Sequence, residues 1–369
     1  MAAVNNPVLM VTLPPDWPGG FWWHLLVFSV IILAFVLSMV IGFIYFERRV
    51  MARMQARLGP NRVGPFGLLQ AIADAVKVLL KEDIVPAKAD KFVHLLAPIV
   101  AFAPALMIFA VIPFQSGAAL ADLNVGILYV SAVASVTSVG IFMAGWSSGN
   151  KYSIIGAMRD IAAIVSYEIP MVLAIAGVVL VAGSLSLNQI VMTQDIPFIL
   201  VQPLGFLLFF LAGCAEINRS PFDLLEADSE IVAGFHTEYS GMKFAMFYLV
   251  EYAEAVAMSA IISTLFLGGW RGPWLPPWLW VIVKTGAVFF LMVWVRTTMP
   301  RARIDQMMAF AWKFLLPLAL INLLVTGVEI LFFPVTIPWT MVVINIVIAL
   351  ALIPLWSKIF RAGWSKVEV

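Results

Sequence analysis

Carboxylate side chains are concentrated in one short stretch that lies between two apolar runs of the sequence. The group comprises Glu216, Asp223, Glu226, Asp228, Glu230 and Glu238. Ser220 and Pro221 suit the start of a helix, on which Glu226 and Glu230, four residues apart, share a face. Such a face either meets solvent or holds coupled carboxyl groups that exchange protons, and this stretch alone leaves both interpretations open.

A second set of carboxylates lies inside apolar segments, where charge is expensive and ionisable side chains face the protein interior. It comprises Glu168, Glu216, Glu251, Glu254 and Glu329, and Lys284 is also inside such a segment. Glu251 and Glu254 are three residues apart, so they lie on one helix face and can share a proton. A proton relay is the favoured interpretation for Glu168, Glu216 and Glu251, whereas Glu329 and Lys284 are more simply explained by pairing or by reaching an interface.

The composition places most of this chain in a bilayer. Of its 369 residues 63% are hydrophobic and 12% are charged, and the mean hydropathy is +1.01, which leaves too little charged surface for a soluble domain. The net charge of +1 gives no reason to expect a nucleic acid partner. A single cysteine, Cys214, excludes a disulfide framework and a thiolate-bound iron–sulfur cluster in this chain, and three scattered histidines argue against a metal site. The sequence also has no glycine-rich dinucleotide-binding motif, so no redox cofactor is expected in it.

Nine hydrophobic segments approach the ~20 residues that a membrane helix needs. They predict an all-α polytopic membrane protein, one integral membrane domain over 1–369, with segments at about 22–46, 92–114, 125–146, 159–182, 198–217, 244–267, 279–298, 312–333 and 336–356. The Pro-containing FPVTIP separates the last two, so eight helices followed by an irregular tail is the alternative count. No Lys or Arg precedes the long first segment, so we do not expect it to be a cleaved signal peptide.

Basic residues predict the orientation of these segments. Alternate connections and the C-terminal tail carry 20 of the 22 Lys and Arg residues, nine of them in the first loop, 47–91. By the positive-inside rule, the N-terminus is expected outside, and the C-terminus and both long loops, 47–91 and 218–243, are expected on the cytoplasmic side.

The first long loop contains two distinct patterns. GLLQAIADAVKVLLK (67–81) has apolar residues at helical spacing, which predicts a short amphipathic helix that lies flat at the interface or covers a cavity. The preceding QARLGPNRVGPFG (55–67) is rich in Gly and Pro and resists helix formation. Such loops are often simple connectors, but its arginines favour an ordered, partner-facing loop with Arg57, Gly59, Pro60, Asn61 and Arg62.

Four stretches resemble the family of the H subunit of respiratory complex I, the NADH–quinone oxidoreductase, whose mitochondrial counterpart is the first NADH dehydrogenase subunit. They are QARLGPNRVGPFGLLQAIADAVK, KYSIIGAMRDIAAIVSYEIP, INRSPFDLLEADSEIVAGFHTEYSGMKFA and WVRTTMPRARIDQMMAFAWKFLLPLAL. The similarity runs in unbroken order from about residue 25 to 333. Some bacterial members have an extra C-terminal helix, which matches the last segment.

The resemblance implies a membrane subunit of the bacterial plasma membrane that forms the access chamber for a quinone, either ubiquinone or menaquinone. Flavin and iron–sulfur clusters are then held by other subunits, and the isolated chain has no activity. The implied partners are the B and D subunits of the hydrophilic arm, the A, J and K subunits of the membrane arm, and lipid. Loops 47–91 and 218–243 form the docking and chamber region.

The resemblance also implies residue roles. Chamber positions are Arg48, Asp74, Phe222, Asp223, Glu226, Asp228 and Glu230. The proton path contains Glu168, Glu216 and Glu251, with Glu254 one turn further on. The sequence departs from the family pattern at Leu225, where many relatives have Pro, at Asp228, usually Glu, and at Ser135, where several relatives have a glutamate of the path. Our hypothesis is that Glu254, or water around Ser135, replaces the missing carboxylate.

Three other classes stay open from the sequence. Buried acids and a buried lysine suit a cation/proton antiporter, although no internal repeat of broken helices is seen. A lipid-modifying enzyme that uses the acidic loop for metal chemistry is disfavoured, because no His/Asp cluster has ligand spacing. Relatives also occur in ferredoxin-, coenzyme F420- and hydrogenase-linked complexes, which this chain does not distinguish.

Overall fold

The computed structural model describes residues 20–116, 119, 121–223, 231–332 and 339–364, and every regular element in these ranges is a helix. The predicted all-α architecture is therefore confirmed. A chain with this composition has little alternative, because in lipid each backbone N–H and C=O must find its partner within the segment itself.

Nine principal helices correspond to the nine predicted segments. They are α1 (Gly20–Met54), α3 (Lys91–Ile108), α4 (Gly126–Ser147), α5 (Lys151–Ala182), α8 (Pro203–Glu216), α10 (Gly241–Phe266), α11 (Pro277–Thr298), α13 (Leu316–Phe332) and α14 (Trp339–Trp364). Shorter helices connect them: α2 (Gln70–Leu79), α6 (Leu187–Thr193), α7 (Phe198–Val201) and α12 (Ile304–Ala309), with 3₁₀ turns η1 (Pro65–Gly67) and η2 (Gly234–His236). A π-helical segment, η3 (Phe310–Leu315), joins α12 to α13.

Seven helices of the described chain are long and apolar enough to cross a membrane. They are α3, α4, α5, α10, α11, the continuous unit Ile304–Phe332, and α14. Because α14 is a regular helix of spanning length, the structure favours nine segments over eight followed by an irregular tail.

Several helix boundaries differ from the sequence prediction: α1 ends at residue 54 and not 46, α3 at 108 and not 114, and α14 at 364 and not 356. Two further differences have a visible cause. Helix α5 begins at residue 151 and not at 159, because the Asn150 side chain accepts a hydrogen bond from the Tyr152 amide (3.1 Å) and caps the helix. The predicted segment 198–217 is divided between α7 and α8 at Gln202. The Gln202 amide donates to the Gly177 carbonyl (3.1 Å) and to Thr326 (3.0 Å), so contacts with α5 and α13 fix the break.

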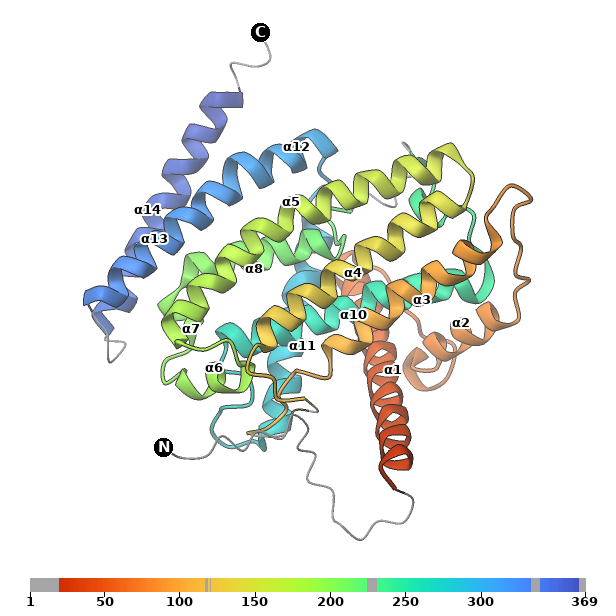
Figure 1. Ribbon diagram of the computed structural model, residues 1–369, viewed down its shortest axis with the longest axis horizontal. Coiled ribbons are helices and arrows are strands. Elements are labelled where there is room, and N and C mark those ends of the chain that lie inside the picture. Colours follow the sequence, from red (N-terminus) through yellow and green to blue (C-terminus); the bar gives the residue numbers. More distant parts are fainter. Residues whose placement is uncertain (1–19, 117–118, 120, 224–230, 333–338, 365–369) are drawn as a thin grey trace.

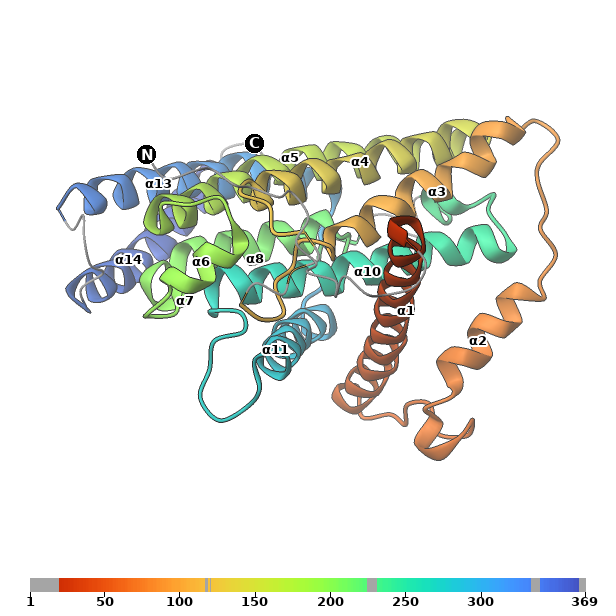
Figure 2. The ribbon, with the colours of Figure 1, turned by 60° about the horizontal axis from the view of Figure 1, so that its bottom comes forward.

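The helices form a layered bundle around α10 (Figures 1 and 2). Helices α3, α4 and α5 lie side by side, and α13 continues this layer beyond α5. Helix α10 packs against α3, α8, α1 and α11, and it is the most buried of the candidate spans. The helix that carries Glu251 and Glu254 therefore occupies the centre of the molecule.

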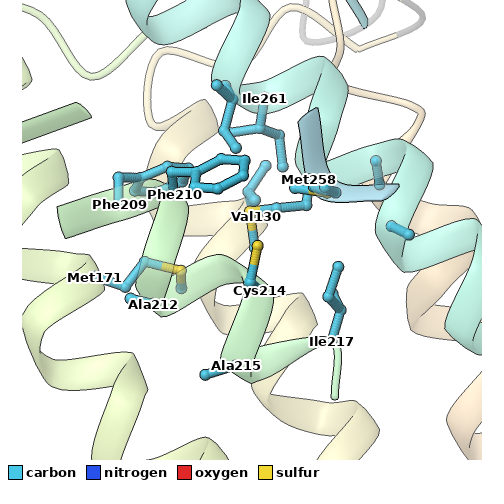
Figure 3. Packing of buried hydrophobic residues seen from close by; sticks show 14 of the residues in the cluster. Val130, Met171, Phe209, Phe210, Ala212, Cys214, Ala215, Ile217, Met258 and Ile261 are labelled. Atoms are coloured by element: carbon cyan, nitrogen blue, oxygen red, sulfur yellow. The ribbon is translucent and has the colours of Figure 1, made fainter. Parts of the chain in front are cut away.

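Small residues let α3 and α4 approach closely. Ala97, Ala101 and Ala105 are fully buried on one face of α3. A Cβ atom added to Gly140 of α4 would lie 2.7 Å from the backbone nitrogen of Ala101, so only glycine fits there. Further along the bundle, α4, α8 and α10 enclose an apolar cluster around Cys214 that includes Val130, Phe209, Met258 and Ile261 (Figure 3).

The two long loops meet at one end of the bundle. The Lys243 ammonium lies 2.8 Å from Asp83, and the Asn150 amide donates to Glu238 (2.7 Å). The Ile84 amide donates to the Ser240 hydroxyl (2.8 Å). We call the described parts of residues 47–91 and 218–243 the loop face. Residues that are far apart in the sequence thus form one surface there.

Candidate functional site

The Gly/Pro-rich stretch of the loop face is an ordered loop that folds back on α1. The Phe66 carbonyl accepts hydrogen bonds from the Tyr45 hydroxyl (2.9 Å) and the Arg49 guanidinium (2.8 Å). Gly67 has φ +78°, and a Cβ atom there would lie 2.2 Å from the Pro60 carbonyl oxygen. Leu58 and Phe66 expose 89% and 75% of their surfaces, so the loop presents apolar side chains outward.

Arg48 and Asp74, assigned separately to the chamber, are in direct contact. The Arg48 guanidinium lies 2.5 Å from the Asp74 carboxylate, and the Gln70 amide donates to the other oxygen (3.0 Å). Burial raises the pKa of Asp74, but the hydrogen bonds from Arg48 and Gln70 and the Arg48 charge outweigh it, so this pKa lies below its usual value. Asp74 is consequently ionised at neutral pH, and its ion pair with Arg48 joins α1 to α2.

Helix α2 is shorter than the stretch predicted as an amphipathic helix, 67–81, because η1 and a turn precede it. Its apolar residues Ile72, Val76 and Leu79 are exposed by 46%, 49% and 62%, respectively. On its other side Lys77 and Val78 line a cleft of about 490 Å³ against η2 and the start of α10. The helix therefore covers a cleft, as expected, and leaves an apolar face for lipid or for a partner protein.

A buried ion network lies beside this pair, and three of its members, Glu47, Arg219 and Arg296, were not assigned from the sequence. Glu47 and Arg219 are 1% and 4% exposed, and Arg219 Nη1 lies 2.9 Å from Glu47 Oε1. Arg296 Nη1 reaches the same oxygen at 2.5 Å, and Arg219 Nε lies 3.2 Å from Glu251. Two cations thus balance two anions, and the Tyr252 ring, 4.3 Å from the Arg219 guanidinium, completes the enclosure.

Hydroxyl groups connect the network to the Arg48–Asp74 pair. The Tyr248 hydroxyl donates to the Tyr252 hydroxyl (3.3 Å), and Tyr248 is within hydrogen-bonding and electrostatic range of Arg48. A continuous series of polar side chains therefore runs from α2 to Glu251 at the centre of the bundle.

Three hollow spaces follow one another from the loop face into the bundle. The cleft beside α2 shares His236 and Phe244 with a first cavity of about 60 Å³, which Asp223, Glu251 and Glu254 also line. A second cavity of about 50 Å³ shares Ile141, Ile217, Asn218 and Glu254 with the first. Because roughly 10–15 Å³ of such space accommodates one water, both cavities have room for several waters.

The predicted proton-path residues lie along these cavities. Glu251 lines the first cavity, Glu254 lines both, and Glu216 lines the second. Glu168 is close enough to Glu216 to interact with it electrostatically. The structure thus brings all four carboxylates, from α5, α8 and α10, into one sequence of neighbouring groups.

His236 stands where the cleft meets the first cavity. Burial lowers the pKa of His236 to about 4, although the nearby Asp223 acts in the opposite direction. The imidazole is therefore neutral near pH 7, and it separates the cleft from the carboxylates without adding a positive charge. The sequence pattern did not distinguish this residue from the other two histidines of the chain.

Of the remaining residues assigned to the chamber, one lines a cavity, one does not, and the others lie outside the described residues. Asp223 is buried, lines the first cavity and lies 3.5 Å from Arg301. Phe222 is packed between Tyr167 and Phe310, with ring centroids 5.4 and 6.1 Å away, and does not line any of the three spaces. Leu225, Glu226, Asp228 and Glu230 lie outside the described residues.

Glu329, Lys284 and Ser135 lie apart from this site. Glu329 is 7% exposed and accepts a hydrogen bond from Asn345 of α14 (2.9 Å), so of the two interpretations that the sequence offered, pairing and an interface, the structure favours a buried polar partner. The Lys284 ammonium donates to the carbonyls of Gly269 (2.9 Å) and Arg271 (2.6 Å). The Ser135 hydroxyl donates to the Ala132 carbonyl of its own helix (3.0 Å).

Among the residues that the structure describes, no group of three or more His, Cys, Asp or Glu side chains is arranged to hold a metal ion. Cys214 is buried with a free thiol. The described part of the site offers carboxyl groups, hydroxyl groups and buried charge pairs.

Comparisons with known proteins agree over almost the whole chain. Residues 27–327 match a family model described as NADH dehydrogenase. The sequence is 60% identical over 351 residues to the H subunit of the NADH-quinone oxidoreductase of Dehalococcoides mccartyi (strain CBDB1), covering 95% of this chain and 99% of that protein. It is 49% identical over 322 residues to the H subunit of Brevibacillus brevis, covering 86% and 95%, and 50% identical over 327 residues to that of Bacillus mycoides, covering 87% and 98%.

Proposed function

Because this chain belongs to the NADH dehydrogenase family, as its sequence motifs indicated, we propose that it is the H subunit of a proton-translocating NADH–quinone oxidoreductase. In this role the chain is an integral membrane subunit of complex I and works only within the assembly. One observation carries the proposal furthest: the cleft and the two cavities share lining residues from the loop face to Glu251, Glu254 and Glu216, and Glu168 interacts electrostatically with Glu216.

The loop face is proposed as the place where the hydrophilic arm docks and where a quinone enters. The ordered loop 55–67 offers exposed apolar side chains to a partner, with the B and D subunits as the expected occupants. Helix α2 covers the cleft, and the Arg48–Asp74 pair fixes it to α1. Arg48, Asp74 and Asp223 would then border the chamber together with the acidic loop residues Glu226, Asp228 and Glu230.

The carboxylates are proposed to pass protons or charge from this chamber toward the A, J and K subunits of the membrane arm. Glu251 is the first of them, since it contacts both the cavity and the buried ion network. A change of charge at the chamber is felt by that network, because electrostatic interactions are strong where water is scarce. Glu254, Glu216 and Glu168 continue the path, and the N-terminus is expected on the side opposite the loop face.

Purification of this chain from its native bacterial membranes in mild detergent tests the assignment. We expect a large assembly that contains flavin and iron–sulfur clusters and that reduces ubiquinone or menaquinone with NADH. Clusters without flavin would instead identify a ferredoxin-, coenzyme F420- or hydrogenase-linked complex. A lone polypeptide would contradict the proposal and favour the cation/proton antiporter.

Neutral amides at the carboxylates separate the two proposed roles. We expect Glu226→Gln and Glu230→Gln to slow quinone reduction without blocking assembly, because they remove charge at the chamber. Glu168→Gln and Glu251→Gln should lower the number of protons moved per electron. Proteoliposomes with a pH-sensitive dye and a quinone-reduction assay measure both quantities, and Asp195→Asn, whose carboxylate is 89% exposed and lies outside the loop face, is the control. Wild-type rates and proton ratios in all four variants would overturn the roles.

Asp74→Asn should affect quinone binding more than folding. The Arg48–Asp74 side chains are 33% and 30% exposed, and such pairs contribute about 1 kcal/mol or less to stability. Loss of the pair releases α2 from α1, so we expect the KM for quinone to rise by up to about fivefold, the equivalent of ~1 kcal/mol. Steady-state kinetics of the assembled complex measure this change, and an unaltered KM would show that the pair does not position the chamber.

A further inference from the structure

Asp160, in the half of α5 nearest the loop face, is a buried carboxylate with no evident structural purpose. Its side chain is 1% exposed, and neither oxygen has a hydrogen-bond partner that satisfies normal geometry among the residues the structure describes. An unpartnered carboxylate anion in such surroundings costs many kcal/mol, whereas the protonated acid costs far less. A residue placed there for stability alone would be apolar.

The groups around Asp160 belong to the junction of the two cavities. The Asn218 side chain is close enough to interact with the Asp160 carboxyl group, and Glu254 interacts with it electrostatically. Asn218 and Glu254 both line the first cavity and the second. Asp160 therefore lies beside the point where a proton must pass from one water-sized space to the next.

The second cavity supplies a reason why additional carboxyl groups are needed at this point. Beyond Glu216 its wall consists mainly of apolar side chains, such as Val130, Phe209 and Ile261 (Figure 3). On the α4 side the polar groups are the hydroxyls of Ser131 and Thr137, and Ser131, like Ser135, donates to a carbonyl of its own helix. Glu254 is near the Thr137 hydroxyl, so α10 supplies at this place the carboxyl group that α4 lacks.

We infer that Asp160 and Glu254 form a carboxyl pair that shares one proton at the junction of the two cavities and passes it between the Glu251 side and Glu216. The inference rests on the proposed function and adds Asp160 to its path. In the transfer, the O–H bond of one carboxyl group breaks as an O–H bond forms on its neighbour, directly or through a cavity water. The proton that the pair gives up toward Glu216 is replaced by one from the Glu251 side, so between transfers the pair holds one proton and one negative charge, and Asn218 can hydrogen-bond to Asp160 in either state.

The principal test is Asp160→Asn in the purified, reconstituted complex, because asparagine keeps the size of the side chain but cannot carry the proton. We expect loss of most proton pumping per electron, while quinone reduction measured with an uncoupler is retained. Asp160→Glu should restore pumping, and Asp195→Asn, whose carboxylate is 89% exposed, should behave as wild type. Pumping by Asp160→Asn at the wild-type ratio would overturn the inference. Absence of NADH–quinone activity from the wild type would instead contradict the proposed function.

Infrared difference spectra of the complex, reduced minus oxidised, provide a second measurement that does not depend on pumping. We expect a carboxylic acid band that changes on reduction, shifts in Asp160→Glu and is altered in Glu254→Gln. If the Asp160→Asn complex does not assemble, this measurement still tests whether residue 160 takes part in proton transfer, because Asp160→Glu retains a carboxyl group at that position. A spectrum of Asp160→Glu identical to wild type in the carboxylic acid region would show that Asp160 takes no part in proton transfer.

Discussion

Replacing Arg219 with methionine is expected to lower the free energy of unfolding by about 3–5 kcal/mol, the largest effect of any single substitution proposed for this chain. Arg219 contacts both Glu47, at 2.9 Å, and Glu251, at 3.2 Å. Its removal leaves two carboxylates with Arg296 as the remaining cation of the network. The cost arises mainly from Glu47, which is 1% exposed and would keep Arg296 as its cation, and not from the loss of one favourable contact.

Equilibrium unfolding in mixed micelles with increasing sodium dodecyl sulfate measures this change. Asp195→Asn is the matched control, since its ion pair with Arg271 is exposed and should contribute about 1 kcal/mol or less. Arg219→Lys keeps the charge but loses the fork that reaches Glu47 and Glu251, so an intermediate loss is expected. If Arg219→Met destabilised the protein no more than Asp195→Asn, the network would not hold α1, α10 and α11 together.

The sequence predicted the helical segments well because bilayer thickness and hydrophobic length constrain them strongly. It predicted the break at Gln202 and the start of α5 poorly, since both depend on single polar side chains. Gln202 donates to α5 and α13, which are distant in the sequence, and Asn150 caps α5 locally. Apolar runs give no signal of either contact.

The candidate site likewise includes residues that the sequence indicated and residues that it did not. The sequence identified Glu168, Glu216, Glu251 and Glu254 because carboxylates inside apolar segments are conspicuous. Glu47 and Arg219 were overlooked because they lie at segment ends among other charges, where a solvated position is the ordinary expectation. Asp160 was overlooked for a related reason. It follows Arg159 at the expected start of a helix, where a solvent-exposed side chain is usual, but the helix begins at residue 151 and Asp160 is buried.

Pairing between the two acids of α10 also depends on tertiary contacts. A spacing of three residues predicts that Glu251 and Glu254 share a face and are able to share a proton. In the structure Glu251 lies against Arg219, whereas Glu254 is near Thr137 and Asp160. The helix period gives the common face correctly, but neighbouring helices determine with which group each carboxylate interacts.

The second large effect is expected from Gly67→Ala in the loop proposed to dock the hydrophilic arm. Gly67 has φ +78°, a conformation that costs an L-residue roughly 1–2 kcal/mol. Its added Cβ atom would also lie 2.2 Å from the Pro60 carbonyl oxygen and 2.4 Å from the carbonyl carbon, both part of the backbone. Since no side-chain movement relieves these contacts, residues 60 and 67 must separate and the loop loses its shape.

Copurification of the hydrophilic arm with this chain measures the consequence. If the loop must hold its shape to dock, the backbone strain alone weakens association about tenfold, and the steric contact weakens it further. Gly286→Ala is the matched control, because nothing lies within 4 Å of a Cβ atom at that helical position. Undiminished copurification with Gly67→Ala would mean that the arm docks elsewhere on the loop face. Loss of the arm with both variants would instead indicate a general fault of assembly, and the loop would then have no special part in docking.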